Sequence, residues 1–332
     1  MDTDKSLYPL QFAPILKERI WGGTRLKTVL GKAAKMERCG ESWELSGVSG
    51  DVSVVANGFL KGNDLQELIE TYMGDLVGDS VYERFGPEFP VLVKFIDAQD
   101  DLSIQVHPDD QLAAGRHGAY GKTEMWYVMD AANDSALISG FSQTMDKERY
   151  VQALNSKALK DVMNFEKVAS GDVFFIPSGR VHAIGKGILL AEIQQTSDVT
   201  YRIYDWDRAD ANGKPRELHT ALALDAIDYS WHSEYKTHYQ KPSQGTVELA
   251  DCPYFTTNLI RFGQPLEKDY RNLDSFVIYI CTSGACSIRW GTSESMNIRK
   301  GGTVLLPAVL NHIQLAPSEP TELLEVFIEK IV

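Results

Sequence analysis

Residues 171–182 read GDVFFIPSGRVH, and the prediction of the fold starts from this segment. A short apolar run ends at Pro177, Gly179 follows two residues later, and His182 lies just beyond. Proline fixes φ near −65° and glycine adopts conformations that other residues avoid, so the pair favours a tight turn between two strands. The segment therefore predicts a strand, a turn and a second strand that carries a histidine.

The same pattern occurs a second time, 130 residues further along the chain. Residues 301–312 read GGTVLLPAVLNH, with glycine, proline and histidine at the offsets of the first copy. This repetition predicts duplication of a β unit. Val309 replaces the turn residue Gly179, and no other histidine lies between residues 250 and 311. We therefore expect the second copy to bind no metal.

Most of the remaining chain consists of short β-branched or aromatic runs, such as FPVLVKFIDA, TEMWYVMDA, GILLAEIQQ and SFVIYICTSG. Many short strands with close turns predict a sandwich or a barrel. Helical periodicity is confined to residues 64–78, 146–165 and 216–227. The polar segment 228–248 predicts a connection between a larger domain over residues 1–235 and a smaller C-terminal β domain over residues 236–332. A long surface loop within one domain is the alternative.

The composition limits the partners and the compartment. The 332 residues carry a net charge of −13 without a cluster of lysine or arginine, which argues against a nucleic acid or an anionic membrane as partner. A small anionic substrate remains compatible with this net charge, because a pocket can be locally basic. The N-terminal residues lack a secretory pattern, no apolar run approaches the roughly 20 residues of a membrane helix, and the four cysteines form no C-x-x-C pair. We expect a cytoplasmic protein with reduced thiols.

Several enzyme signatures are absent from the sequence. It contains no G-x-x-x-x-G-K-[ST] phosphate loop, no G-x-G-x-x-G dinucleotide fingerprint and no G-x-S-x-G nucleophile elbow. Phosphoryl transfer from ATP, nicotinamide-dependent redox chemistry and serine-hydrolase chemistry are therefore disfavoured.

Polar residues alternate along two of the predicted strands. In SIQVHPDD (103–110), a period of two places Gln105 and His107 on one face, and Glu124 follows 17 residues later in GKTEMWYV. Together with His182, these side chains form a mixed nitrogen and oxygen set on three strands. Such a set suits Zn²⁺ or another first-row divalent ion.

These segments resemble a known family. The pattern G-x5-P-x-G-x2-H matches the second conserved motif of the cupin β-barrels. With SIQVHPDD, GKTEMW, GRVHAIGKG and EIQQTSDVTYRIYDWDR, it resembles type I phosphomannose isomerase in its short bacterial form, from about Pro9 through the predicted helix at 216–227 and more loosely beyond. The resemblance implies a mainly β protein made of duplicated cupin-type jelly-roll barrels with a few helices packed outside.

The resemblance also implies an activity and a set of site residues. The activity is the reversible interconversion of D-mannose 6-phosphate and D-fructose 6-phosphate through a cis-enediol(ate), with one Zn²⁺ per chain in the domain 1–235. The family's metal ligands correspond to Gln105, His107, Glu124 and His182. Its catalytic residues correspond to Arg202, Glu192, Lys122 and Asp198, and its substrate-facing residues to Ser103, Lys122, Glu41 and Trp21. Longer members carry a tyrosine where this chain has Ile184.

The chemistry of an aldose–ketose isomerase agrees with these residue types. A fixed guanidinium stabilises anionic charge without a change of protonation, which suits Arg202. The base could be Glu192, Asp198 or Lys122, and Glu192 is preferred. Other hypotheses are another metal-dependent cupin, either an oxygenase or a different sugar isomerase, and a non-catalytic sugar-phosphate sensor. The sequence does not predict the oligomeric state.

Overall fold

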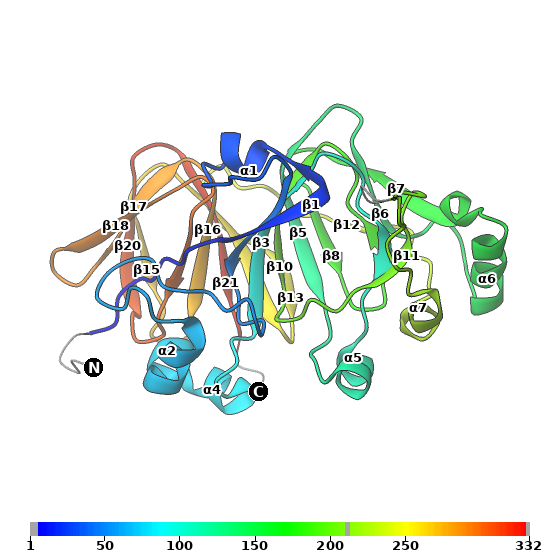
Figure 1. The fold of residues 1–332 in the computed structure, drawn as a ribbon. Helices are drawn as coiled ribbons and strands as arrows, with labels where there is room; N and C mark the ends of the chain where they lie inside the picture. Colours follow the sequence, from blue (N-terminus) through cyan, green and yellow to red (C-terminus); the bar gives the residue numbers. More distant parts are fainter. Residues whose placement is uncertain (1–5, 210–212, 330–332) are drawn as a thin grey trace.

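The computed structural model describes residues 6–209 and 213–329 and is built mainly of strands (Figure 1). Residues 1–5, at the start of the segment without a secretory pattern, lie outside the described residues. The predicted mainly β, duplicated cupin-type fold is confirmed, with four antiparallel sheets arranged as two barrels. None of the described helices combines the length and apolar character that crossing a membrane requires.

The N-terminal barrel consists of a seven-stranded and a five-stranded sheet. The larger sheet has the order β1 (Ile15–Gly23), β2 (Cys39–Leu45), β3 (Val91–Ala98), β10 (Ile188–Gln195), β5 (Glu124–Ala131), β8 (Val173–Ile176) and β12 (Lys236–Thr237). The smaller sheet has the order β11 (Tyr201–Tyr204), β4 (Ile104–Val106), β9 (His182–Ala183), β6 (Ala136–Phe141) and β7 (Met163–Lys167).

The C-terminal barrel repeats this two-sheet plan. Its first sheet has the order β13 (Gly245–Cys252), β14 (Phe255–Phe262), β21 (Thr321–Phe327), β16 (Val277–Ser283) and β19 (Thr303–Leu306). Its second sheet has the order β15 (Leu266–Asp269), β20 (His312–Pro317), β17 (Ala285–Trp290) and β18 (Glu294–Arg299). Because β12 pairs with β8, residues 236 and 237 belong to the seven-stranded sheet of the N-terminal barrel. The division into domains at residues 235 and 236 stays our proposal.

Apolar packing joins the two barrels. One large cluster contains Val93 and Met125 from the seven-stranded sheet and Leu259, Ile278 and Leu324 from the first sheet of the C-terminal barrel, all fully buried. The seven-stranded sheet is therefore covered on both faces, which accounts for the continuous apolar runs of its central strands. Figure 1 shows the two barrels side by side in this arrangement.

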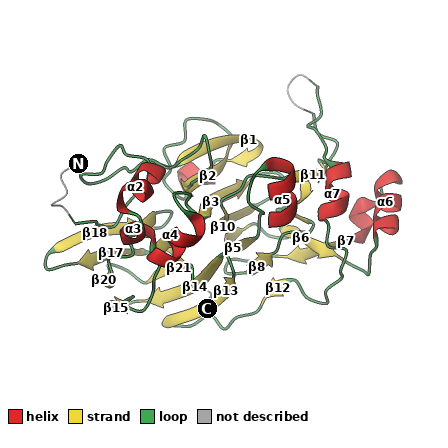
Figure 2. Cartoon of the chain, turned by 90° about the horizontal axis from the view of Figure 1, so that it is seen from below, coloured by secondary structure: helices red, strands yellow, loops and turns green. Residues whose placement is uncertain are grey.

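The helices lie outside the sheets (Figure 2). They are α1 (Arg25–Thr28), α2 (Leu65–Tyr72), α3 (Gly74–Val77), α4 (Asp79–Phe85), α5 (Asp110–His117), α6 (Lys147–Asn155), α7 (Thr220–Ala226) and the 3₁₀ turn η1 (Leu159–Val162). The predicted helix at 64–78 is divided into α2 and α3. The helix predicted at 216–227 is shorter, because residues 216–219 are not helical and α7 begins at Thr220. Asp64 caps α2 by accepting from the backbone N–H of Glu67 at 2.8 Å, and the Glu67 side chain completes the capping box.

The predicted helix over 146–165 is wrong beyond residue 155. Asp146 caps α6, but Lys157 has a φ of +57°, which ends the helix, and Met163–Lys167 forms β7 against β6. Leu159 and Met163 keep the apolar spacing of a helix because both pack into the cluster beneath α6 and α7. Pairing with β6 is a long-range contact that the local pattern does not contain.

The two copies of the opening motif differ at their turns. Gly179 has a φ of +86° in a turn closed by a hydrogen bond from the Arg180 N–H to the Pro177 carbonyl at 3.1 Å, as in a type II turn. Leu310 closes the second turn in the same way, but Val309 does not have a positive φ.

The histidines that follow these turns differ in their surroundings. His182 is fully buried inside the N-terminal barrel, whereas 63% of the His312 side chain is exposed beside Glu267. Ile313, the next residue, faces the apolar interior of the C-terminal barrel. This orientation supports the prediction that the second unit binds no metal, which stays a prediction.

Candidate metal centre and substrate cavity

A cavity of about 440 Å³ opens on the inner face of the N-terminal barrel. It lies between the two sheets, so strands far apart in sequence contribute to its walls. Eight residues predicted for the site line it: Trp21, Glu41, Ser103, Gln105, Lys122, Glu192, Asp198 and Arg202. The other three, His107, Glu124 and His182, are buried beneath it in contact with Lys122 and Gln105.

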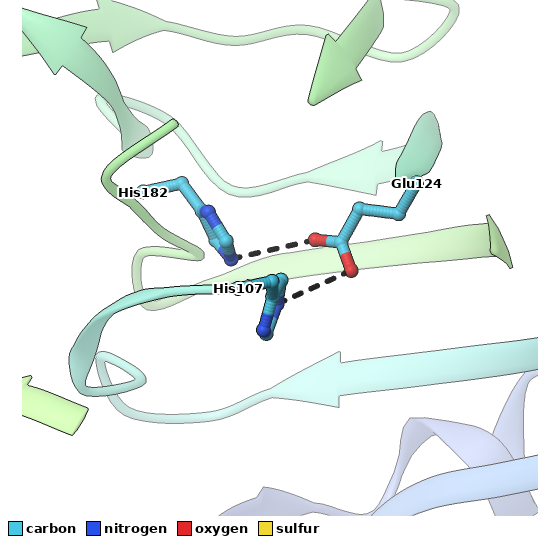
Figure 3. Close-up of side chains that lie close together, drawn as sticks. All are labelled: His107, Glu124 and His182. Atoms are coloured by element: carbon cyan, nitrogen blue, oxygen red, sulfur yellow. Dashed lines mark ion pairs between the residues drawn. The ribbon is translucent and has the colours of Figure 1, made fainter. Parts of the chain in front are cut away.

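These three buried residues form a compact cluster (Figure 3). The Glu124 carboxylate faces both imidazoles, with Oε2 3.4 Å from His107 Nε2 and Oε1 3.4 Å from His182 Nε2. One ligand atom from each residue can be chosen so that all three lie within 4.8 Å of one another. Each residue comes from a different part of the barrel: His107 follows β4, Glu124 begins β5 and His182 begins β9.

Backbone carbonyls orient both imidazoles toward the centre of the cluster. His107 Nδ1 lies 3.0 Å from the Val199 carbonyl oxygen, and His182 Nδ1 lies 2.8 Å from that of Arg180. A carbonyl can only accept, so each Nδ1 carries the proton and donates it. The lone pair of each Nε2 consequently faces Glu124, which is the arrangement typical of metal-binding histidines.

The protonation states also suit a cation. Burial lowers the pKa of His107 to about 3, with the Lys122 ammonium acting in the same direction, and burial also lowers the pKa of His182. Although burial opposes ionisation of Glu124, Lys122 and the two histidines lower the pKa of its carboxyl well below the usual range. At neutral pH the cluster offers two neutral imidazoles and one carboxylate.

The fit to a metal ion is further supported by two groups around the cluster. Glu124 Oε1 is buried and has no hydrogen-bond partner, which is the state expected of a ligand atom. The Lys122 ammonium lies 2.9 Å from His107 Nε2 and 2.5 Å from Glu124 Oε2. The lone pairs of these two atoms therefore already face a positive charge. The Gln105 side chain borders the cluster, with its Nε2 3.3 Å from His182 Nε2.

Arg202 lies next to this centre. It pairs with Gln105 across β11 and β4, so the two side chains neighbour each other on the inner face of the sheet. Its Nη1 donates to the Glu217 carbonyl at 2.8 Å, its Nε is buried without a partner, and none of the ion pairs among the described residues includes it. The cavity thus contains a guanidinium whose charge no carboxylate of the described residues neutralises by direct contact.

Glu192, by contrast, is held at both oxygen atoms. Oε1 accepts from Lys94 Nζ at 3.0 Å and Oε2 accepts from Trp126 Nε1 at 2.9 Å. Lys94 also donates to Gln194 Oε1 at 2.7 Å, and all these groups are buried. The orientation of the Glu192 carboxylate is therefore fixed before any substrate binds.

β1 and β2 of the same sheet continue this wall of the cavity. Arg19 holds Glu41 through two hydrogen bonds of 2.9 and 3.1 Å, and Trp43 Nε1 donates to the same carboxylate at 2.7 Å. Burial disfavours the charged form, yet Lys94 and Arg19 lower the pKa of Glu41. Trp21 lies beside them with its ring almost fully buried.

Sequence reasoning missed three cations that line the cavity. Lys94 is a single charge within the apolar run FPVLVKFIDA, and this irregularity was a usable signal. Arg19 and Arg216 occur in ordinary polar surroundings that carry no such signal. Arg216 is held by Asp205 through hydrogen bonds of 2.7 and 2.5 Å. Glu192 and Arg202 lie on different strands, because residues 196–200 separate β10 from β11.

The fold and the site define a cupin with a candidate metal centre at the base of a highly charged cavity. Residues 9–135 match the family model described as phosphomannose isomerase type I, catalytic domain. Mannose-6-phosphate isomerase ManA of Bacillus subtilis is 43% identical over 254 residues, which covers 75% of this chain and 78% of that protein. The chain therefore belongs to the type I phosphomannose isomerase family.

Solved structures agree with this assignment. The crystal structure of the mannose 6-phosphate isomerase from Bacillus subtilis superposes with a TM-score of 0.87 at 33% identity, covering 96% of this chain and 99% of that chain. A mannose 6-phosphate isomerase bound with zinc and yttrium shares the fold at 16% identity, with a TM-score of 0.78 and coverage of 98% and 100% of the two chains.

Proposed function

We propose that this protein interconverts D-mannose 6-phosphate and D-fructose 6-phosphate with one zinc ion per chain. The observation that carries this proposal is the buried cluster of His107, Glu124 and His182 beneath a cavity that also contains the guanidinium of Arg202. Membership of the family supports the choice of substrate. The four free cysteines support a reducing compartment, and we propose the cytoplasm.

The donor set fits zinc, with His107, Glu124, His182 and Gln105 as the proposed ligands. Zinc favours imidazole nitrogen and carboxylate oxygen, and two Nε2 lone pairs with one unpartnered carboxylate oxygen meet this preference. The named relative with bound zinc supports the same choice of metal. A divalent ion bound here supplies Lewis-acid polarisation of the sugar oxygens.

The reaction moves a proton between C1 and C2 through a cis-enediol(ate). We assign this transfer to Glu192, whose carboxylate Lys94 and Trp126 hold in one orientation. Lys122 and Asp198 also face the cavity and are the other candidates for moving protons. Although burial disfavours the ammonium, Glu124 and Glu192 raise the pKa of Lys122, so in this state it donates hydrogen bonds.

The substrate's negative charges require cationic partners in the cavity. Arg202 is assigned to the charge that develops on the enediolate, because it neighbours Gln105 and none of the described carboxylates contacts it directly. Ser103 and Lys122 are assigned to binding of the phosphate or of the sugar hydroxyls. Glu41 and Trp21 complete the wall against which the sugar ring packs.

Turnover of mannose 6-phosphate by the purified protein tests this proposal. Formation of fructose 6-phosphate is followed before chelation, after EDTA treatment and dialysis, and after return of one equivalent of Zn²⁺. We expect loss and recovery of activity. Metal-independent turnover would contradict the role of the ion, and absence of turnover in the zinc-loaded protein would reject the assigned reaction.

The same samples distinguish the alternatives. A sugar-phosphate sensor binds mannose 6-phosphate in calorimetry but does not convert it. A different sugar isomerase converts another aldose phosphate in preference to mannose 6-phosphate. An oxygenase requires a redox-active metal and consumes O₂, which an oxygen electrode detects.

A further inference from the structure

The carboxylate of Asp110 connects three segments of the molecule. Asp110 is the first residue of α5 and lies three residues after His107. Its Oδ1 accepts from the Gly121 N–H at 2.8 Å and from Gln195 Nε2 at 2.9 Å. Its Oδ2 accepts from the Tyr254 hydroxyl at 2.6 Å. Both oxygen atoms are therefore used, and no two of the three donors belong to the same segment.

Gln195 extends this connection to the residue before Glu124. The side-chain carbonyl of Gln195 accepts from the Thr123 N–H at 2.8 Å, and its backbone N–H donates to the Thr123 carbonyl at 3.1 Å. The Lys122 N–H donates to the Pro108 carbonyl at 3.1 Å. Residues 121–123 are thus bonded on one side to the segment after His107 and on the other to the end of β10.

The packing at this point leaves no room for adjustment. A Cβ added to Gly121 would lie 2.6 Å from the Asp110 backbone nitrogen, so the two backbones are in direct contact. Lys122 and Glu124 follow immediately, and their side chains meet His107 inside the barrel. The distance between the strand that carries His107 and the strand that carries Glu124 consequently depends on the contacts of Asp110.

Tyr254 brings the C-terminal barrel into this arrangement. It lies in the turn between β13 and β14, outside the barrel that contains the metal cluster. Arg84 of α4 donates to the Pro253 carbonyl at 2.7 Å and holds the same turn. Although burial favours the neutral acid, the hydrogen bonds from Tyr254 and Gln195 lower the pKa of Asp110, which keeps it an acceptor for all three donors.

We propose that Asp110 and Tyr254 are positioning residues, through which the C-terminal barrel holds Lys122 and Glu124 in register with His107. Neither residue lines the cavity, so each acts through the segment at 121–123. The kinetic part of this inference rests on the proposed isomerase activity, whereas its metal-binding part does not. It assigns the C-terminal barrel a part in building the metal centre.

Tyr254→Phe is the decisive variant, because it removes one hydroxyl and leaves the ring in place. We expect zinc affinity, measured by competition with a chromophoric chelator, to fall several-fold, and kcat to fall with little change in KM. Loss of the carboxylate in Asp110→Ala should weaken zinc binding about tenfold or more, the range typical of residues that orient metal ligands. Asp110→Asn, which keeps the volume, should lie between the two.

Tyr239→Phe is the matched control. Its hydroxyl also donates at 2.6 Å, to the Gly171 carbonyl, and its contact with β5 is to Tyr127 rather than to any residue of 121–124. We expect its zinc affinity and kcat to equal those of the unmodified protein. Equal losses in Tyr254→Phe and Tyr239→Phe would indicate general loosening and overturn the inference.

The zinc-affinity measurement and the kinetic measurement together separate this inference from the proposed function. Unchanged zinc affinity and unchanged kcat in Tyr254→Phe overturn the positioning role, whatever the outcome for Asp110→Ala. If the unmodified protein binds zinc but does not convert mannose 6-phosphate, the proposed function fails, and the zinc affinities alone decide the inference. If Asp110→Ala does not fold, Tyr254→Phe and Asp110→Asn carry the test.

Discussion

Replacement of Arg202 by alanine should separate catalysis from folding and from metal binding. The side chain makes one hydrogen bond from Nη1, to the Glu217 carbonyl, whose loss costs about 0.5–1.5 kcal/mol of stability. Burial and the neighbouring Arg216 both lower the pKa of Arg202, so its removal also relieves an unfavourable placement of charge. The net change in the free energy of unfolding should therefore be small.

The effect on turnover should be much larger. A preorganised donor that faces developing negative charge typically contributes about 10²–10³ in kcat, or roughly 2.7–4 kcal/mol of transition-state stabilisation. We expect kcat of Arg202→Ala to fall on the order of 10²-fold or more. The zinc content should stay at one ion per chain, because Arg202 is not among the proposed ligands.

Three measurements on the same preparation test this reasoning. Steady-state kinetics on mannose 6-phosphate give kcat and KM, elemental analysis gives the zinc content, and thermal unfolding gives Tm. Arg202→Lys is the control, since it keeps the charge but loses the planar fork, and it should recover part of the rate. A kcat for Arg202→Ala close to that of the unmodified protein, with zinc bound, would refute the assigned role.

Three further predictions concern residues away from Arg202. His312→Ala should keep one zinc per chain and normal kcat, because this histidine is exposed; loss of metal by elemental analysis would show that it is a ligand. Lys94→Met should lower stability in urea unfolding by about 3–5 kcal/mol, since it leaves the buried Glu192 unpaired, and adding Glu192→Gln should recover part of the loss; a change below about 1 kcal/mol would contradict this. Burial opposes ionisation of Glu322, but hydrogen bonds from Tyr127 and other donors lower its pKa below the ordinary 4.5. The ionised Glu322 therefore contributes fully to stability above pH 4.5, and this contribution is lost as the pH falls through the lowered pKa. The Tm of Glu322→Gln should therefore fall less steeply on acidification than that of the unmodified protein, and parallel profiles would exclude this contribution.

The sequence predicted best those features that depend on local backbone chemistry. Pro177 and Gly179 define their turn within a few residues, and the alternation in SIQVHPDD fixes which side chains share a face. The capping residues Asp64 and Asp146 were likewise readable, because a cap is a contact over three residues. Such features need no knowledge of what packs against them.

The features that sequence missed depend on contacts between distant segments. β7 exists because β6 pairs with it, and nothing within residues 156–165 indicates this partner. Lys94 belongs to the site because β3 pairs with β10 and places it opposite Glu192. His312 is exposed because its neighbour Ile313 packs into the C-terminal barrel, and the repeated motif did not predict this exposure.

The apolar contact between the barrels also constrains how the chain folds during synthesis. The seven-stranded sheet is complete once β12 at Lys236–Thr237 has been made, but β21, which helps to cover its outer face, is made roughly 80 residues later. At about 5–20 residues per second, the ribosome needs on the order of 4–16 s to supply that strand. During this interval a nascent chain exposes a broad apolar sheet, and this is the stage at which a chaperone should bind it.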